Sequence, residues 1–185
     1  PGGADRKAGG PQAAGPGRPA SLPSGARVVL KIGSSSLTRD DGGLDLNRID
    51  VLTRLIASLR HRGHDVVLVS SGAVAAGLPA LGMERRPTEL RLLQAAASVG
   101  QGRLVASWQT AMSAYGTVAA QVLLTAQDVA VRSHYRTVRA TFDALLTMGA
   151  VPVVNENDAV ATTEFSLGDN DRLAALVSHL VTADV

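Results

Sequence analysis

Apolar positions along this chain follow two alternating patterns, short continuous runs and longer stretches with helical spacing. The continuous runs are rich in valine and leucine and predict four strands, at residues 27–32, 65–70, 117–124 and 150–155. Elsewhere apolar residues recur every three or four positions and predict helices near residues 49–59, 93–112, 133–148 and 170–181. Runs without polar alternation indicate strands buried on both faces, as in a parallel sheet. Residues 183–185 then look like the approach to another strand.

This order of elements predicts an α/β fold, a three-layer αβα sandwich with a mainly parallel central sheet. Right-handed crossovers would place helices on both faces of that sheet. Ligands of such sheets bind at the carboxyl ends of the strands, so the residues that follow each strand are the first candidates for chemistry.

The first 25 residues differ in composition from the rest of the chain. Twelve of them are glycine or proline and few are apolar, which predicts a disordered tail over 1–25 and a folded part over 26–185. No apolar run in the sequence approaches the roughly 20 residues of a membrane span, and the first residues lack the apolar stretch of a secretory signal. We therefore expect a cytoplasmic protein without a membrane partner.

Charge and rare residues narrow the classes of function. The absence of cysteine excludes disulfides and thiolate chemistry, and the four histidines show no metal-ligand spacing, so we expect no metal site made by the protein. The net charge of +2 comes from arginines scattered among acids, which disfavours nucleic acid as a partner. The only two lysines are Lys7 in the tail and Lys31 in a strand. A lysine in an apolar strand needs a specific explanation.

The segment VVLKIGSSSL places Lys31 near the end of the first strand, before a loop of small residues. Backbone N–H groups of such a loop can approach phosphates closely, and a lysine adds positive charge. Lys31, Gly33 and Ser34 are therefore candidate phosphate- or nucleotide-binding residues. The alternative is that Lys31 snorkels from an edge strand and the serines form a turn. The P-loop pattern and G-x-G-x-x-G are both absent, so P-loop enzymes and dinucleotide dehydrogenases are unsupported.

Two further strand ends carry polar residues. The segment VLVSSGAVAAG opens a helix through Ser71 and Gly72, where N–H groups and the helix dipole favour an anion, unless Ser71 simply caps the helix. After the last strand, residues 155–158 and 168–171 are all glycine, asparagine or acidic. Turns and helix caps explain one of these acids well, but not all of them. Together the three segments describe a site for an amino acid beside a nucleotide.

These motifs, in this order, resemble the glutamate 5-kinases of the amino-acid kinase family. The resemblance covers residues 27–185 and rests on VVLKIGSSSLT, VLVSSGAVAAG, LLQAAASVGQGRL and VPVVNENDAVAT with LGDND. It implies an incomplete amino-acid kinase fold and transfer of the γ-phosphoryl group of ATP, with Mg²⁺, to the side-chain carboxylate of L-glutamate. The product would be L-glutamyl 5-phosphate, in the first step of proline biosynthesis. The first loop is shared with kinases of other acceptors, so this assignment rests mainly on the third segment.

The resemblance also implies roles for particular residues. Lys31 matches a phosphate-contacting lysine and Asp169 matches an aspartate that organises the active-site lysines, so both are catalytic candidates. The glutamate site would consist of Ser71, Gly72, Asp158 and Asn170. A glutamate carboxylate is ionised at neutral pH and needs no general base, so catalysis depends on alignment and charge neutralisation. We expect Asp158 to pair with the substrate ammonium and Asp171 to orient its neighbours.

Members of the family carry a nucleotide-binding half with a second active-site lysine, which the 185 residues do not contain. We therefore expect these residues alone to have little or no kinase activity and to expose a sheet edge. The family further implies L-glutamate as substrate, proline as a possible feedback inhibitor and a homo-oligomer. Two alternatives stay open, an amino-acid kinase with another acceptor and a non-catalytic glutamate- or proline-binding fragment. In a purely structural protein, each acid would be a cap and each serine a turn.

Overall fold

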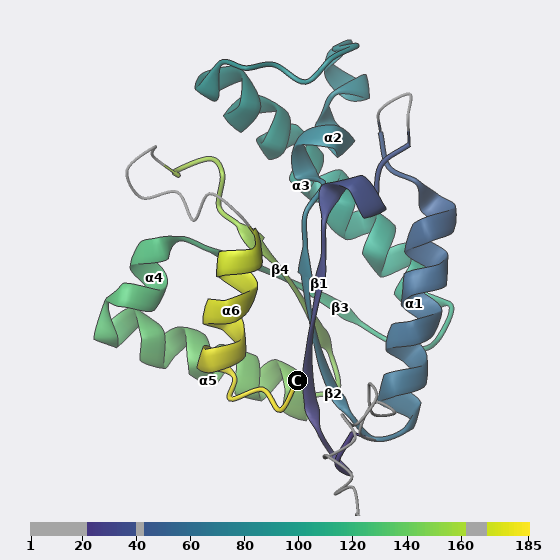
Figure 1. Cartoon of the computed structure of the whole chain (residues 1–185), viewed down its shortest axis with the longest axis vertical. Helices are drawn as coiled ribbons and strands as arrows, with labels where there is room; N and C mark the ends of the chain where they lie inside the picture. Colours follow the sequence, from purple (N-terminus) through teal and green to yellow (C-terminus); the bar gives the residue numbers. More distant parts are fainter. Residues whose placement is uncertain (1–21, 40–42, 162–169) are drawn as a thin grey trace, which may run out of the picture.

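A four-stranded parallel sheet forms the centre of the molecule. The computed structural model describes residues 22–39, 43–161 and 170–185. The strands lie in the order β1-β2-β4-β3 and all neighbours are parallel (Figure 1). Their bounds are β1 Arg27–Ile32, β2 Asp65–Ser70, β3 Ala119–Leu124 and β4 Val151–Glu156. The α/β fold and the four predicted strands are confirmed, although β3 begins two residues later than predicted.

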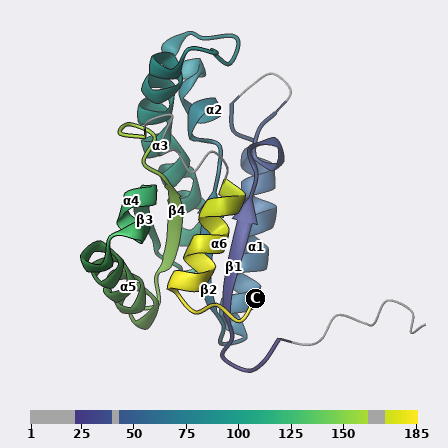
Figure 2. The same ribbon diagram turned by 60° about the vertical axis from the view of Figure 1, so that its left-hand side comes forward.

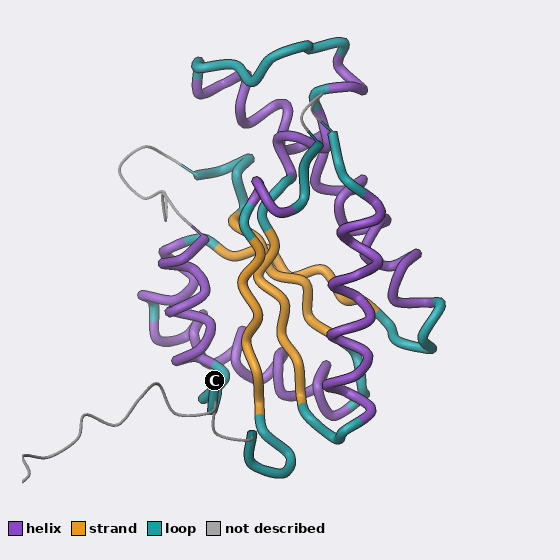
Figure 3. Tube along the Cα trace, turned by 45° about the vertical axis from the view of Figure 1, so that its right-hand side comes forward, coloured by secondary structure: helices purple, strands orange, loops and turns teal. Residues whose placement is uncertain are grey.

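Helices connect the strands and flank the sheet (Figure 3). Their bounds are α1 Leu46–His61, α2 Ala73–Gly77, α3 Leu90–Ser113, α4 Ala126–Ala130, α5 Arg132–Thr147 and α6 Asn170–Leu180, with 3₁₀ turns η1 Ser34–Ser36 and η2 Pro79–Leu81. The four predicted helices correspond to α1, α3, α5 and α6. The short α2 begins where the sequence predicts that a helix opens, whereas α4 is not among the predicted elements.

The two faces of the sheet carry separate hydrophobic cores. Along β2, Val66 and Leu68 pack against α1 and α3, while Val67 and Val69 pack against α5 and α6. Successive strand residues point to opposite faces, so a strand covered on both sides must be apolar throughout. The largest fully buried helical side chains of the two cores are Ile49, Ile56, Leu104, Trp108 and Met112 on one face and Phe142, Leu173 and Leu180 on the other. Three layers result, as predicted (Figure 2).

The direction in which the chain crosses the sheet determines which face each helix covers. From β1 through β2 to β3 the chain moves one way, and α1 and α3 cover one face. From β3 to β4 it moves back, and α5 and α6 cover the other face. Crossovers of a single hand require this change. The neighbours β2 and β4 are therefore followed by helices on opposite faces, which opens a crevice at their carboxyl ends.

Residues 184 and 185 lie along the outer edge of β1. The Asp184 N–H donates to the Arg27 carbonyl, and the Val29 N–H donates to the Val185 carbonyl, both at 2.8 Å. The Arg27 guanidinium also donates to the Val181 carbonyl at 2.7 Å. The two backbone hydrogen bonds alternate between residues 184–185 and β1 as between neighbouring strands, which agrees with the predicted approach to another strand.

Two glycines let α2 and α3 cross in backbone contact. A Cβ atom built on Gly100 would overlap the Ala73 carbonyl oxygen, and one built on Gly77 would overlap the Ala96 carbonyl oxygen. Further along α3, the buried Trp108 donates its indole N–H to the Ser70 hydroxyl at 3.0 Å, at the end of β2. Helix α3 is thereby fixed both to α2 and to the sheet.

The structure tests two expectations about the whole chain, on membrane spans and on the tail, only for the residues that it describes. Among the residues that it describes, no helix is long and apolar enough to cross a membrane. The predicted tail falls mainly on residues 1–21, which lie outside the described part, so its disorder stays a prediction.

Replacing Gly100 with alanine should destabilise the protein, because the added methyl group forces α2 and α3 apart. We expect a loss of about 1–3 kcal/mol, typical of an overpacked contact, and a melting temperature lower by several degrees. Gly102→Ala is the matched control on the same helix, since a Cβ there meets no described atom within 4 Å. It should stabilise the helix by roughly 0.5–1 kcal/mol. Equal melting temperatures for the two variants would contradict the close crossing.

Candidate functional site

A polar pocket of about 230 Å³ lies at the carboxyl ends of the strands, in the crevice between β2 and β4. Its lining includes residues from every segment that the sequence singles out, together with one arginine: Ser34, Ser71, Gly72, Ala73, Val74, Ala75, Arg86, Asn155, Glu156, Asp158 and Asn170. Residues up to 136 positions apart in the chain therefore meet in one place. The predicted convergence of the three segments is observed.

Lys31 approaches this region from β1 and is held by an acid of α6. Its ammonium lies 2.6 Å from the Asp171 carboxylate, in the first turn of α6. The Lys31 side chain is 30% exposed, so it meets this partner instead of extending freely into solvent. Gly33 follows directly, and a Cβ atom there would lie 3.5 Å from the Lys31 ammonium nitrogen. The pairing argues against simple snorkelling from an edge strand.

The loop after β1 is a short helical turn fastened to α1. Residues Ser34–Ser36 form η1, in which the Leu37 N–H donates to the Ser34 carbonyl at 2.9 Å. The Arg48 guanidinium, from α1, donates to the Ser35 carbonyl at 2.9 Å. The loop that was predicted to face phosphates is thus held in one conformation at the rim of the pocket.

Ser71 does not cap a helix, contrary to the simpler of its two interpretations. The cap of α2 is Gly72, whose positive φ of 107° favours glycine, and no side-chain hydrogen bond caps this end. The Ser71 hydroxyl instead accepts a hydrogen bond from the Asn170 amide at 2.6 Å. Because α2 has only five residues, its dipole favours an anion less strongly than that of a longer helix would.

A row of three side-chain amides connects α3 to the pocket. The Asn155 amide Nδ2 donates to Gln101 Oε1 at 2.9 Å, in a buried bond. The Asn155 carbonyl Oδ1 in turn accepts from Asn170 Nδ2 at 3.3 Å, the same nitrogen that donates to Ser71. Asparagine and glutamine side chains each carry both donor and acceptor atoms, so the amides of such a row fix one another's relative orientation.

Two acids, Glu156 and Asp158, lie in the pocket near a single arginine, Arg86. Burial and then the negative charge of Glu156 raise the pKa of Asp158 to about 6, although the positive charge of Arg86 acts in the opposite direction. The Asp158 carboxylate is therefore poorly compensated by the groups around it. A cationic ligand group would relieve this cost.

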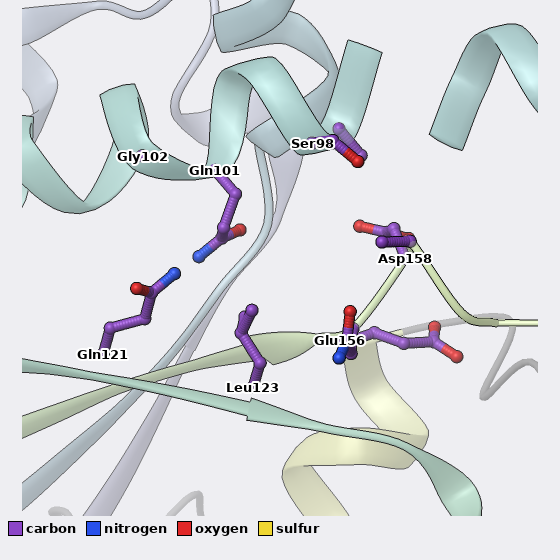
Figure 4. Close-up of a pocket in the computed structure, with 10 residues that line it drawn as sticks. Ser98, Gln101, Gly102, Gln121, Leu123, Glu156 and Asp158 are labelled. Atoms are coloured by element: carbon purple, nitrogen blue, oxygen red, sulfur yellow. The ribbon is translucent and has the colours of Figure 1, made fainter. Parts of the chain in front are cut away.

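A second pocket, of about 340 Å³, adjoins the first and shares Glu156 and Asp158 with it. Figure 4 shows it between α3 and the end of β3, with Gln101 and Gln121 at one end and Asp158 and Glu156 at the other. Within the described ranges, no group of three or more histidine, cysteine or acidic side chains could hold a metal ion.

The structure brings most of the predicted site residues together. Ser34 and the four proposed glutamate-site residues Ser71, Gly72, Asp158 and Asn170 line one pocket. Lys31 and Gly33 lie outside its lining, and Lys31 pairs with Asp171, which directly follows the lining residue Asn170. Asp169 lies outside the described residues, so its predicted role stays a prediction.

Three functional candidates received no role from the sequence. Gln101 is a polar residue on an otherwise apolar helix face, and that irregularity was an available signal. Glu156 belongs to the predicted acidic cluster, but only the structure shows that it raises the pKa of Asp158. Arg86 comes from an irregular stretch between η2 and α3, where no periodic pattern points to it.

Comparison with known proteins finds one family and a consistent set of relatives. The model of the amino acid kinase family matches residues 26–185. A glutamate 5-kinase of Streptomyces coelicolor is 57% identical over 159 residues, which are 86% of this chain and 42% of the relative. A glutamate 5-kinase of Thermobifida fusca is 55% identical over 166 residues, or 90% and 43% of the two chains. The chain thus spans less than half the length of these relatives.

Replacing Asp158 with asparagine should stabilise the protein above pH 6 and have little effect near pH 4. The folded pKa of about 6 lies above the ordinary value of 3.8, so the folded state holds this proton more strongly than the unfolded state. Charging the group therefore lowers the free energy of unfolding as the pH rises from about 4 to about 6. We expect a gain on the order of 1–2 kcal/mol at pH 7.5, after allowing for solvent screening.

The matched control is Asp50→Asn, because Asp50 forms an exposed pair with Arg54 at 3.0 Å. That change should alter the free energy of unfolding by less than about 0.5 kcal/mol. Thermal melts of both variants at pH 4 and pH 7.5 provide the comparison. A gain for Asp158→Asn that is the same at both pH values would contradict the raised pKa.

Proposed function

This chain belongs to the amino acid kinase family, and we propose that it supplies the acceptor-binding part of a glutamate 5-kinase. The reaction would transfer the γ-phosphoryl group of ATP to the side-chain carboxylate of L-glutamate and form L-glutamyl 5-phosphate, the first step of proline biosynthesis. The observation that carries the proposal is the pocket at the end of β2 and β4, where Ser71, Asp158 and Asn170 meet beside Lys31. The similarity to glutamate 5-kinases supports the choice of acceptor.

The amino-acid end of the substrate would be bound by charge and hydrogen bonds. We assign the substrate ammonium to Asp158, because a cation offsets the burial and the repulsion from Glu156 that raise the pKa of this carboxyl group. Ser71 already accepts a hydrogen bond from Asn170, so its own O–H proton is assigned to a substrate carboxylate. The Gly72 N–H lies next to it in the lining and would serve the same carboxylate.

The phosphoryl end would be handled by Lys31 and the loop that follows it. The acceptor carboxylate is already ionised at neutral pH, so the protein has to align it and neutralise the charge of the transferred group. Asp171 holds the Lys31 ammonium at the edge of the pocket, where it can contact a phosphoryl oxygen. Gly33 and Ser34 would approach the nucleotide phosphates through their backbone. Asp169 is retained as the residue proposed to organise the active-site lysines.

Magnesium would enter with ATP and neutralise its phosphates. The described residues offer no cluster of three or more acidic or histidine ligands, so we assign the ion to the nucleotide phosphates and not to a site made by the protein.

The direct test is acceptor-dependent release of ADP from ATP by the full-length protein, with the acyl phosphate of L-glutamate also trapped as a hydroxamate by hydroxylamine. By ADP release, L-glutamate should be the preferred acceptor over aspartate, N-acetylglutamate, carbamate and UMP, and proline is tested as an inhibitor in the same assay. Turnover of another acceptor would reassign the substrate. Calorimetric binding of glutamate or proline without turnover would favour a non-catalytic binding module.

Lys31→Ala should lower kcat by about 100-fold or more, because the transferred group then loses the cation that we assign to its charge. KM for glutamate should change much less, since the pocket that holds the amino acid keeps its lining. Arg54→Ala removes an exposed cation far from the pocket and should leave both parameters unchanged. A kcat for Lys31→Ala within a few fold of the unmodified enzyme would remove the role assigned to this lysine.

Asp158→Asn should raise KM for glutamate at pH 7.5 by at least about 30-fold, the cost of an unpaired substrate ammonium. In the unmodified enzyme, glutamate affinity should fall as the pH drops below about 6, because the free pocket then takes up a proton on Asp158 that the ammonium must displace. The affinity of Asp158→Asn should be flat over the same range. A calorimetric series from pH 5 to pH 8 checks this, and an unchanged pH profile in the variant would exclude the ammonium assignment.

A further inference from the structure

We propose that Gln101 is a positioning residue of the acceptor pocket, which acts by holding Asn155 in one orientation. The inference rests on the proposed function and deepens it. Gln101 lies on α3 and lines the adjoining 340 Å³ pocket, but it is absent from the lining of the 230 Å³ pocket, so it would act on a ligand there through another residue. Its side chain reaches that pocket through Asn155, which does line it.

The hydrogen bonds in the row of amides all have the same donor-to-acceptor direction, from Asn170 to Asn155 and from Asn155 to Gln101. Gln101 is only 9% exposed, and its Oε1 atom accepts the Asn155 Nδ2 proton at 2.9 Å. This bond places Asn155 Oδ1 on the opposite side, where it accepts from Asn170 Nδ2 at 3.3 Å. The two ends of an asparagine amide are nearly equal in size, so hydrogen-bond partners, not shape, decide which way it faces.

Removing the Gln101 oxygen would free Asn155 to turn. A rotated Asn155 would present its NH₂ group to the NH₂ group of Asn170, and two donors cannot bond to each other. The side-chain amide of Asn170 would then turn away from the Ser71 hydroxyl, to which it donates at 2.6 Å. The residues proposed to hold the substrate would lose their arrangement without any change in their own chemistry.

Folding alone does not account for an amide at this position. The Gln101 Nε2 atom is buried and has no hydrogen-bond partner among the described residues. A buried amide nitrogen without a partner destabilises a protein, so an apolar residue beside Ala97 and Leu104 would pack at lower cost. Figure 4 shows the Gln101 amide at the wall of the second pocket, facing Gln121. The Nε2 end of the Gln101 side chain therefore lowers the stability of the protein, while the Oε1 end holds Asn155.

The test uses two substitutions that remove the oxygen in different ways, Gln101→Met and Gln101→Ala, in the full-length protein. Methionine keeps the volume, and alanine enlarges a pocket that solvent can fill, so at least one variant should fold. Each should weaken glutamate binding about tenfold, the size expected for one hydrogen bond. The kcat and the KM for ATP should stay within about twofold, because Lys31 and η1 are untouched.

A double-mutant cycle with Asn155→Ala separates positioning from general damage. If Gln101 acts through Asn155, Gln101→Met should have little further effect once Asn155 is alanine. Ser98→Ala is the control, since Ser98 lines the same second pocket but donates to the Gln94 carbonyl at 2.8 Å. Its glutamate affinity should stay within about twofold of the unmodified protein.

Three outcomes would overturn the inference. One is a glutamate affinity that stays within twofold in both Gln101 variants. The second is a loss of equal size with and without the Asn155 side chain. In either case the unmodified protein still phosphorylates glutamate and the proposed function stands. If the unmodified protein neither binds nor phosphorylates glutamate, the proposed function and this inference fail together.

Discussion

The strands β2 and β4 lie side by side, yet the chain leaves them on opposite faces of the sheet, and the rest of the site depends on this divergence. Only two residue pairs join them, Leu68 with Val153 and Val69 with Val154, whereas β1 and β2 are joined by six. Beyond these pairs the two strands separate, and helix α3 contacts a polar side chain at the end of each, through Trp108 to Ser70 and through Gln101 to Asn155. The row of amides that connects α3 to the pocket thus begins where the two strands part.

The charges in the pocket lower the free energy of unfolding of the protein. Two acids share it, and the pKa of Asp158 rises to about 6 because burial and Glu156 disfavour its charge. Of the positively charged groups nearby, Arg86 lines the pocket and only partly offsets the charge, while Lys31 lies outside the lining and is paired with Asp171. Proteins often keep such unfavourable charges where a ligand completes the arrangement. The amino-acid ammonium that we propose as the ligand of Asp158 would supply this compensation.

Patterns of apolar residues were enough to predict the sheet and the main helices, because strands covered on both faces must be apolar throughout and helices must bury one stripe. Helix α4 was not predicted because it has only five residues and no apolar periodicity, although the sequence does contain its capping box of Thr125 and Asp128. The site was predicted as three segments, but not the contacts between them. That Ser71 bonds to Asn170 instead of capping α2 depends on tertiary distances, as does the effect of Arg86 on Asp158.

The first turn of α6 links the two halves of the proposed chemistry. Asn170 and Asp171 are consecutive, and neighbouring residues of a helix point about 100° apart. Asn170 accordingly contacts Ser71 and Asn155 between β2 and β4, while Asp171 contacts Lys31 on β1. Any displacement of this turn moves the group that orients the acceptor and the group that holds the lysine together. In the proposed reaction, alignment of the acceptor and neutralisation of the transferred charge would therefore both depend on one helix, which the hydrophobic contacts of Leu173 and Val177 hold against the sheet.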